Sequence, residues 1–262
     1  MKTKTTGFHP LTNSQWAFIR PILEPDTRRR KVDLRQVFNG LLYVLRTGCQ
    51  WRLLPEEYPH WAACYYYFDK WMHSGRLEVA SKALNILDRR RVGKAARASM
   101  LLIDAQSVGL DPTLYEHRGI DGGKRVNGQK RIIVTDTEGR LEACSVVEAN
   151  RHDSPAAALT LTDHIEVLAP QKVIADKGFG GTFARAMTRI KVKFETTGSL
   201  SKEPGFVVAK WRWVVERTFA WMRWCRRLVH VHEHTASAHN AFLYLFNCSL
   251  MLNRLRNSVL IS

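Results

Sequence analysis

Cysteine is scarce in this chain, and the cysteines present are isolated from one another. The 5 cysteines among 262 residues are Cys49, Cys64, Cys144, Cys225 and Cys248. An odd number with no close pair argues against both a disulfide framework and a zinc knuckle. We therefore expect the protein to work in a reducing cytoplasm.

Long apolar runs are absent as well. The basic start, Lys2 and Lys4, is followed by Thr, Gly, His and Pro rather than by the apolar stretch of a signal peptide. No other segment approaches a membrane span, and we find no internal repeat or low-complexity tract. These absences exclude a membrane protein and a repeat architecture from our expectations.

Acidic residues are too few to balance the basic ones. The chain has 40 Lys+Arg against 24 Asp+Glu, a formal net charge of +16, and a pI near 10.0. The excess is concentrated at the front, where residues 1–98 hold 18 basic and 8 acidic side chains. Such a charge attracts polyanions, so nucleic acid or an anionic membrane surface is the expected partner. The 45% hydrophobic content is enough for a folded core, which makes disorder an unlikely class.

Helix signals dominate the first third of the sequence. A capping box at Thr12 and Gln15 predicts one helix, and Asp33 begins an amphipathic helix that ends at Gly48. A third helix is expected to open at His60 and stop before Gly75. Three helices with basic connectors are compatible with a helix-turn-helix module, although the aromatic residues alone are equally typical of a core and the arginine runs of a solvated surface. The connectors contain Arg28, Arg29, Arg30 and Lys31, then Arg89, Arg90, Arg91 and Lys94.

From residue 99 the pattern changes to that of a mixed α/β fold. Short β-branched or apolar runs predict strands at 100–104, 131–136, 141–147 and 172–176. Between the last two, Asp153 and Ser154 begin an alanine-rich and leucine-rich helix that is expected to end near Leu168. We place a linker at residues 92–98, which divides the chain into an all-α, helix-turn-helix-like DNA-binding domain (1–98) and an α/β domain (99–262).

Two predicted strands end on a carboxylate. Asp104 follows three apolar residues, and Asp176 follows another apolar strand and precedes a glycine-rich turn. Neighbouring strands can bring two such carboxylates together, and a hard divalent cation with oxygen ligands relieves their repulsion best. The pattern therefore predicts a magnesium site.

A third acid lies in a segment that we expect to be one helix over residues 206–228. On a helical wheel, Arg212, Arg223 and Arg227 fall on the face of Glu216, whereas the apolar residues lie opposite. A basic face carrying one acid suggests contact with phosphate groups. An ordinary surface ion-pair stripe would explain the same spacing.

Taken together, these motifs resemble the Asp-Asp-Glu transposases of bacterial insertion sequences, particularly the insertion sequence 4 and 5 groups. The resemblance spans nearly the whole chain, from the front segments around Trp16 and Trp51 to the acid segments Ile103–Val108, Ala175–Phe179 and Arg212–Trp221. In the third segment the chain matches the family's helix motif with Arg212, Glu216 and Arg223. It departs from that motif at Ala209, where the family has tyrosine.

The resemblance implies a ribonuclease H-like catalytic domain with two Mg²⁺ or Mn²⁺ ions. Asp104 would bridge the ions, and Asp176 and Glu216 would each complete one of two metal sites about 3.5–4 Å apart. The implied activity is binding of element ends, cleavage by water and transfer of the freed 3′-hydroxyl into target DNA, without a nucleotide cofactor. Double-stranded DNA, a homodimer on paired ends and a nucleoid-associated bacterial protein complete the expectation.

Basic side chains supply the expected DNA contacts. They are Arg212, Arg223, Lys177, Lys124, Arg125, Lys130, Arg28, Arg29 and Arg30. The segment 122–131 is also open to interpretation as a simple hairpin loop. A fold error would favour Asp136 or Asp153 as catalytic acids, and His230, His232 and His234 are better explained as surface or strand residues than as a metal site. A DNA-binding regulator without catalysis and a nuclease that cannot join DNA remain alternative functions.

Overall fold

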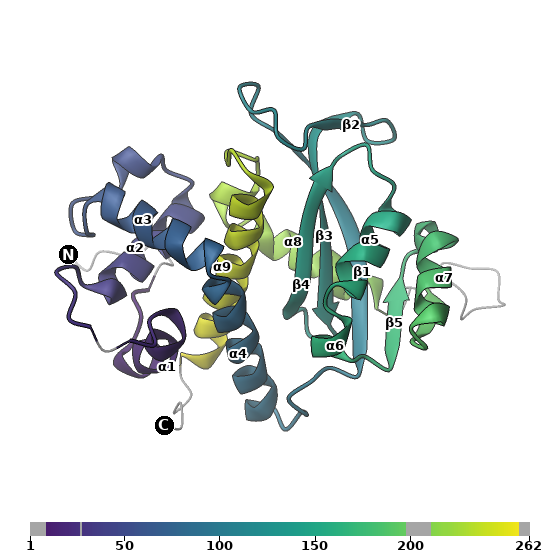
Figure 1. The fold of residues 1–262 in the computed structure, drawn as a ribbon, viewed down its shortest axis with the longest axis horizontal. Helices are drawn as coiled ribbons and strands as arrows, with labels where there is room; N and C mark the ends of the chain where they lie inside the picture. Colours follow the sequence, from purple (N-terminus) through teal and green to yellow (C-terminus); the bar gives the residue numbers. More distant parts are fainter. Residues whose placement is uncertain (1–8, 27, 198–210, 257–262) are drawn as a thin grey trace, which may run out of the picture.

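The computed structural model describes residues 9–26, 28–197 and 211–256, and its front part is helical (Figure 1). The helices are α1 Asn13–Leu23, α2 Leu34–Thr47, α3 Trp61–His73 and α4 Arg76–Arg91, with a short 3₁₀ helix η1 Trp51–Leu53. The first three confirm the sequence prediction. The Thr12 hydroxyl and the Gln15 side chain form the expected capping box, and Gly48 ends α2 at a φ of 69°.

Helix α4 is a correction, because the sequence analysis treated its last turn as a basic connector. Its inward face carries Ser81, Asn85, Asp88 and Arg89 beside the leucines, and all four side chains are buried. A helix whose buried face is this polar lacks the apolar period by which helices are predicted. Of the three arginines at its end, Arg89 therefore points into the protein rather than toward a partner.

The second part of the chain is built on one mixed sheet. Its strands are β1 Met100–Gly109, β2 Gly119–Asp121, β3 Val126–Asp136, β4 Leu141–Glu148, β5 Lys172–Ala175 and β6 Lys193–Thr196. Strand β3 pairs antiparallel with β1, β2 and β4, whereas β1, β5 and β6 run parallel to one another. The α/β class is confirmed. The short strands β2 and β6 were not expected.

Helices cover both faces of the sheet (Figure 1). They are α5 Asp153–Thr162, α6 Ile165–Leu168, α7 Thr182–Arg189, α8 Arg212–Met222 and α9 Ala236–Leu255, with short 3₁₀ helices η2 Lys177–Phe179 and η3 Arg226–Leu228. The single helix predicted up to Leu168 is broken at Asp163 and His164, polar residues whose side chains compete for backbone groups. In the described part of the chain no helix is both long and apolar enough to cross a membrane.

Alternation along β1 assigns each side chain to one of two cores. Leu101 and Ile103 pack with α5, α6 and α7, whereas Leu102 lies in the core that contains α8, α9 and the front helices. Strand β5 follows the same rule, with Val173 on the first face and Ile174 on the second. The second face therefore includes the even-numbered positions that lead to Asp104 and Asp176.

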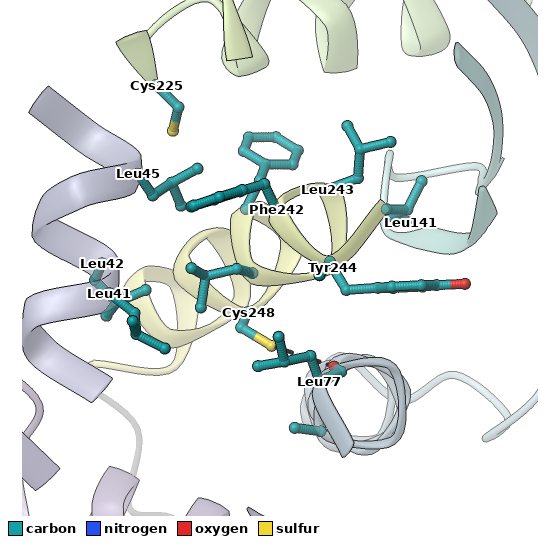
Figure 2. Close-up of a cluster of buried hydrophobic side chains, with 14 of the residues drawn as sticks. Leu41, Leu42, Leu45, Leu77, Leu141, Cys225, Phe242, Leu243, Tyr244 and Cys248 are labelled. Carbon is teal, nitrogen blue, oxygen red and sulfur yellow. Dashed lines mark hydrogen bonds between the residues drawn. The ribbon is translucent and has the colours of Figure 1, made fainter. Parts of the chain in front are cut away.

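Helix α9 connects the front helices to the sheet (Figure 1). It packs against α2, α3 and α4 on one side and against β4 on the other. Figure 2 shows the centre of this contact, where Phe242, Leu243 and Cys248 of α9 lie among leucines of α2, α4 and β4. Helix α9 thus packs on both the front helices and the α/β part. The two parts share one core, and the division at 92–98, which falls between α4 and β1, stays a prediction.

A buried network of charges fastens α4 to the β3–β4 turn. Arg140 lies at its centre, with Nη1 2.7 Å from Asp136 Oδ2 and Nη2 2.8 Å from Asp88 Oδ2. Arg89 also binds Asp136, and Arg254 of α9 approaches Asp88 at 3.5 Å. Burial alone would raise the pKa of Asp136, but the neighbouring Arg140 holds it below its ordinary value. Asp136, a reserve candidate for catalysis, is therefore a structural residue. We call this group the junction network.

Candidate active site

Two of the predicted acids lie side by side on adjacent parallel strands, Asp104 within β1 and Asp176 directly after β5. The expectation that the first strand ends at Asp104 is wrong, because β1 stays paired with β3 as far as Gly109. Strands β1 and β5 are in register, and their last paired residues are Ile103 and Ala175. Asp104 and Asp176 each follow directly. Neighbouring strands are about 4.8 Å apart, so the backbone alone places the two carboxylates in one small region. Both side chains share the face of the sheet that α8 covers, because they have the parity of Leu102 and Ile174.

Asp104 occupies the more enclosed of the two positions. Burial raises the pKa of Asp104 to about 6, and the negative charge of Asp176 acts in the same direction. The Ala105 amide, which donates to Asp104 Oδ1 at 2.7 Å, and the cations Lys124 and Arg212 oppose this rise in pKa. Burial is thus the main cause of the raised pKa of Asp104, and the nearby cations do not offset it.

Glu216 lies on α8 and is held by Arg212 of the same helix. Arg212 Nε donates to Glu216 Oε1 at 2.9 Å, and Arg212 Nη1 lies 3.9 Å from Asp176 Oδ2. The charge of Asp176, followed by Glu216, raises the pKa of Arg212. Both members of the Arg212–Glu216 pair are more than half exposed. Arg212 therefore links the two acids that the sequence analysis assigned to different metal sites.

The long helix predicted for 206–228 is wrong at its C-terminal end. Helix α8 stops at Met222, and Arg227 lies in η3, where it is buried and bonded to Glu233. The helical-wheel prediction that Arg227 shares the face of Glu216 is therefore wrong. Arg223, the C-cap residue of α8, is exposed. Ala209 and the predicted start of the helix lie outside the described residues.

The donors present suit a divalent cation only in part. Among the residues that the structure describes, no group of three or more His, Cys, Asp or Glu is placed to hold a metal ion. Asp104 and Asp176 nevertheless offer carboxylate oxygens, the ligands that Mg²⁺ and Mn²⁺ prefer, and their repulsion favours a cation. Thr197, which sequence reasoning missed, lies 3.5 Å from Asp176 through its hydroxyl and helps line the depression between the acids. No sequence signal marked it.

The expected DNA-contacting cations fall into two groups. The exposed ones are Arg28, Arg29, Lys124, Arg125, Lys177, Arg212 and Arg223. Lys130 is a correction, because it is only 7% exposed and its ammonium binds Arg151 O and Asp153 Oδ1, both at 2.6 Å. Arg30 is held by Glu24 and Asp26. Sequence reasoning missed the burial of Lys130 because it predicted a strand only from residue 131, whereas β3 begins at Val126 and is buried from Gly128 on.

The segment 122–131 is a hairpin, as its second interpretation held. Residues 122–125 form the turn between β2 and β3, and the Asp121 carboxylate accepts from the amides of Gly123 and Lys124, both at 3.0 Å. Lys124 still lies close enough to influence Asp104. The turn therefore borders the candidate active site.

Known protein families match both parts of this chain. Residues 96–252 match a family described as "Transposase DDE domain", and residues 11–80 match one described as "Putative transposase of IS4/5 family". A curated relative from Burkholderia cepacia, "Putative transposase for insertion sequence element IS402", is 31% identical over 199 residues, which are 69% of this chain and 92% of the relative. A crystal structure of the catalytic core domain of BIV integrase aligns with a TM-score of 0.36 and 12% identity, over 56% of this chain and 82% of that one.

The sheet order supports the same assignment. Three long strands, β4, β3 and β1, pair antiparallel, and β5 and β6 follow β1 in parallel, which agrees with the mixed α/β domain expected after residue 98. Enzymes with this domain generally use divalent metal ions. With a DDE domain over more than half of its length and a relative that matches most of it, this chain belongs to the DDE transposases of insertion sequences, in the IS4/5 family, a class of enzymes that process nucleic acid.

Proposed function

We propose that this protein binds the ends of an insertion sequence, cleaves them and transfers the freed strands into target DNA. The observation that carries the proposal is the pair Asp104 and Asp176, side by side on adjacent parallel strands under a helix that bears Glu216. Arg212 is the arginine close to all three acids, so the site has more negative than positive charge. A DNA phosphate bound without metal ions would add to that negative charge. Such a site suits divalent cations and phosphodiester chemistry.

Asp104, Asp176 and Glu216 are the proposed ligands of two Mg²⁺ or Mn²⁺ ions. When bound, the ions would activate the nucleophile and stabilise the leaving oxygen. Glu216 joins the other acids only if Arg212 releases it. Arg212 would then exchange a carboxylate for a DNA phosphate, an equally good partner for its planar fork of donors.

The proposed reaction has two phosphodiester exchanges. In the first, water attacks a phosphorus atom at the element end, the bond from phosphorus to the 3′-oxygen breaks, and a 3′-hydroxyl and a 5′-phosphate result. In the second, that 3′-hydroxyl attacks a phosphodiester of target DNA and releases another 3′-hydroxyl. One P–O bond forms for each one broken, so no nucleotide cofactor is required.

The remaining cations would position the DNA. Arg223 and Lys177 flank the carboxylates, Lys124 and Arg125 extend from the β2–β3 turn, and Arg28 and Arg29 project from the front region, 1–98, which we propose binds the element ends. Such contacts fix the register of the duplex without reading its sequence. Since two ends must be joined together, we propose a homodimer on paired ends.

The test is a joining assay with a labelled DNA that carries the element's ends, a supercoiled target plasmid, and Mg²⁺ or Mn²⁺. Wild-type protein should give joined products, and Asp104→Asn should give none while keeping its melting temperature and its affinity for the ends. A variant that fails to fold would contradict the catalytic assignment. Binding without cleavage would favour a DNA-binding regulator, and cleavage without joining would favour a nuclease.

A further inference from the structure

A groove lies next to the active site and is lined by an unusual number of glycines. Its walls are the β2–β3 turn, the start of α5 and the turn that leads into α7, and its volume is about 770 Å³, in the range of ligand-binding sites. The glycines that line it are Gly122, Gly123, Gly178, Gly180 and Gly181. We call this feature the glycine groove. Gly178 is two residues from Asp176, so the groove begins where the carboxylates end.

Two of these glycines are not required by the fold. At Gly122 and Gly178 a Cβ atom would meet no described atom within 4 Å, and neither residue has the positive φ that favours glycine. Elsewhere in the sheet glycine is needed. A Cβ at Gly128 would lie 1.9 Å from Val108 O, and one at Gly119 2.3 Å from Asn150 Oδ1. Because glycine increases the entropy lost on folding, a glycine that packing does not demand suggests close approach by something outside the chain.

Both walls of the glycine groove are fixed by side-chain hydrogen bonds. Asp121 accepts from the amides of Gly123 and Lys124 at 3.0 Å. Across the groove, the Ser154 hydroxyl donates to Gly180 O at 2.5 Å and accepts from the Phe183 amide at 2.8 Å. A groove with fixed walls loses little freedom when it binds a ligand.

The charge of the groove favours an anionic ligand. Lys124 is exposed on one wall, and Arg151 and His152 are exposed on another. The lining contains three cations, Lys124, Lys130 and Arg151, and two acids, Asp121 and Asp153, so it has one positive charge in excess. Asp153 binds Lys130 at 2.6 Å, Asp121 keeps its charge while it accepts from backbone amides and Ser107, and Arg151 is paired with Glu148 outside the lining at 3.0 Å. Lys124 also acts on Asp104 electrostatically, so this cation of the groove is near enough to influence the active-site carboxylates.

We propose that the glycine groove binds one sugar-phosphate strand of DNA beside the active-site carboxylates, with the backbone at Gly122 and Gly178 in direct contact with it. This inference rests on the proposed function for the identity of the ligand. The missing Cβ atoms let the strand approach the main chain, and Lys124 and Arg151 neutralise its phosphates.

The experiment uses the full chain and a short fluorescein-labelled DNA duplex, without metal, so that binding is measured apart from cleavage. The double variant Gly122→Ala/Gly178→Ala should keep or slightly raise its melting temperature and bind DNA about tenfold more weakly. Lys124→Ala should make the slope of log affinity against log salt concentration less steep by about one, the change expected for the loss of one phosphate contact. Arg189→Ala, which removes an equal charge at the opposite end of α7, should leave that slope unchanged.

The proposal would be overturned if the double variant bound DNA as tightly as wild type. It would also be overturned if the melting temperature of the double variant fell by several degrees, because folding would then need these glycines. A third contrary result would be the same change of salt slope in Arg189→Ala as in Lys124→Ala. The joining assay separates this inference from the proposed function. If wild-type protein neither cleaves nor joins but the glycine variant binds weakly, the groove stands and the catalytic proposal fails. If the glycine variant binds and joins like wild type while Asp104→Asn is inactive, only the groove is refuted.

Discussion

The junction network and the candidate active site are made of the same residue types and behave in opposite ways. In the junction network, Asp88, Asp136 and Arg140 are at most 1% exposed at their side chains, and further arginines complete the balance of charge. In the active site, Glu216 and Arg212 are more than half exposed and three acids share one close arginine. Balanced, buried charges hold two elements together. Unbalanced charges at a depression are available to bind something else.

The pKa values express the same difference. Arginine lowers the pKa of buried Asp136, whereas burial and the charge of Asp176 raise the pKa of Asp104 to about 6. The first carboxylate is satisfied within the protein, and the second is not. A perturbed carboxylate near a cleft is a better indicator of function than an acid at the end of a strand, because Asp136 ends β3 and is structural, whereas Asp104 lies within β1.

The largest effect should come from removing the centre of the junction network. Arg140→Met leaves Asp88 and Asp136 buried without their main partner, and we expect a loss of about 3–5 kcal/mol in the free energy of unfolding. Urea denaturation measures it. Arg151→Met is the control, because Arg151 pairs with Glu148 at an exposed position, and it should cost less than about 1 kcal/mol. Equal losses of stability in the two variants would show that the buried junction network contributes no more to stability than an exposed ion pair.

A smaller effect concerns Glu142, a buried acid beside the junction network. Burial, together with the charge of Asp136, raises the pKa of Glu142 to about 7. The folded protein keeps this proton over the pH range in which the unfolded chain releases it, so stability falls as pH rises from about 4.5 to about 7. Glu142→Gln should remove that fall, and its stability relative to wild type should improve by about 2–3 kcal/mol between pH 5 and pH 8. Parallel stability curves for the two proteins would show that Glu142 ionises normally.

The active site should respond to divalent cations, unlike the junction network. Mg²⁺ or Mn²⁺ should stabilise the wild-type fold by about 1–3 kcal/mol at concentrations above the dissociation constant, seen as a higher melting temperature. Asp104→Asn and Asp176→Asn should lose this response, and Asp163→Asn, a change at the exposed acid that follows α5, should keep it. Glu216→Gln tests whether Arg212 releases Glu216. If it responds like wild type, Glu216 is not a ligand of the ions.

The smallest effect on stability should come from the surface cation Arg223. Arg223→Ala should change the free energy of unfolding by less than about 0.5 kcal/mol, because the residue is exposed at the end of α8. It should weaken the binding of all DNA sequences alike. The slope of log affinity against log salt concentration should become less steep by about one, as for the loss of one phosphate contact. A loss confined to particular sequences would contradict a phosphate contact and indicate that Arg223 reads bases.

Local signals were reliable where the chain alone decides the structure. The caps at Thr12, Asp33 and Gly48 begin and end helices at the expected places, since capping depends on residues within one turn. The strands that lead to Asp104 and Asp176 were equally visible, because strands buried on both faces appear as apolar runs. The family resemblance rested on these same segments.

The errors occurred where distant parts of the chain meet. Helix α4 escaped prediction because its buried face is polar, and several of those polar groups are bonded by distant segments, as when Asn247 of α9 donates to Asn85 at 2.8 Å. Lys130 was predicted to contact DNA, but in the structure it binds Asp153 at the start of α5. Arg227 left the face of Glu216 because the chain turns after Met222 and buries it against Glu233.

The sequence by itself therefore determined the classes of elements, the excess of positive charge and the identity of the candidate acids, because these depend on residue type and local spacing. Only the tertiary structure decided which charges are neutralised inside the protein and which face the site. That decision depends on burial and on partners far apart in the chain, such as Asp88 with Arg140 or Lys124 with Asp104. No local pattern contains those distances.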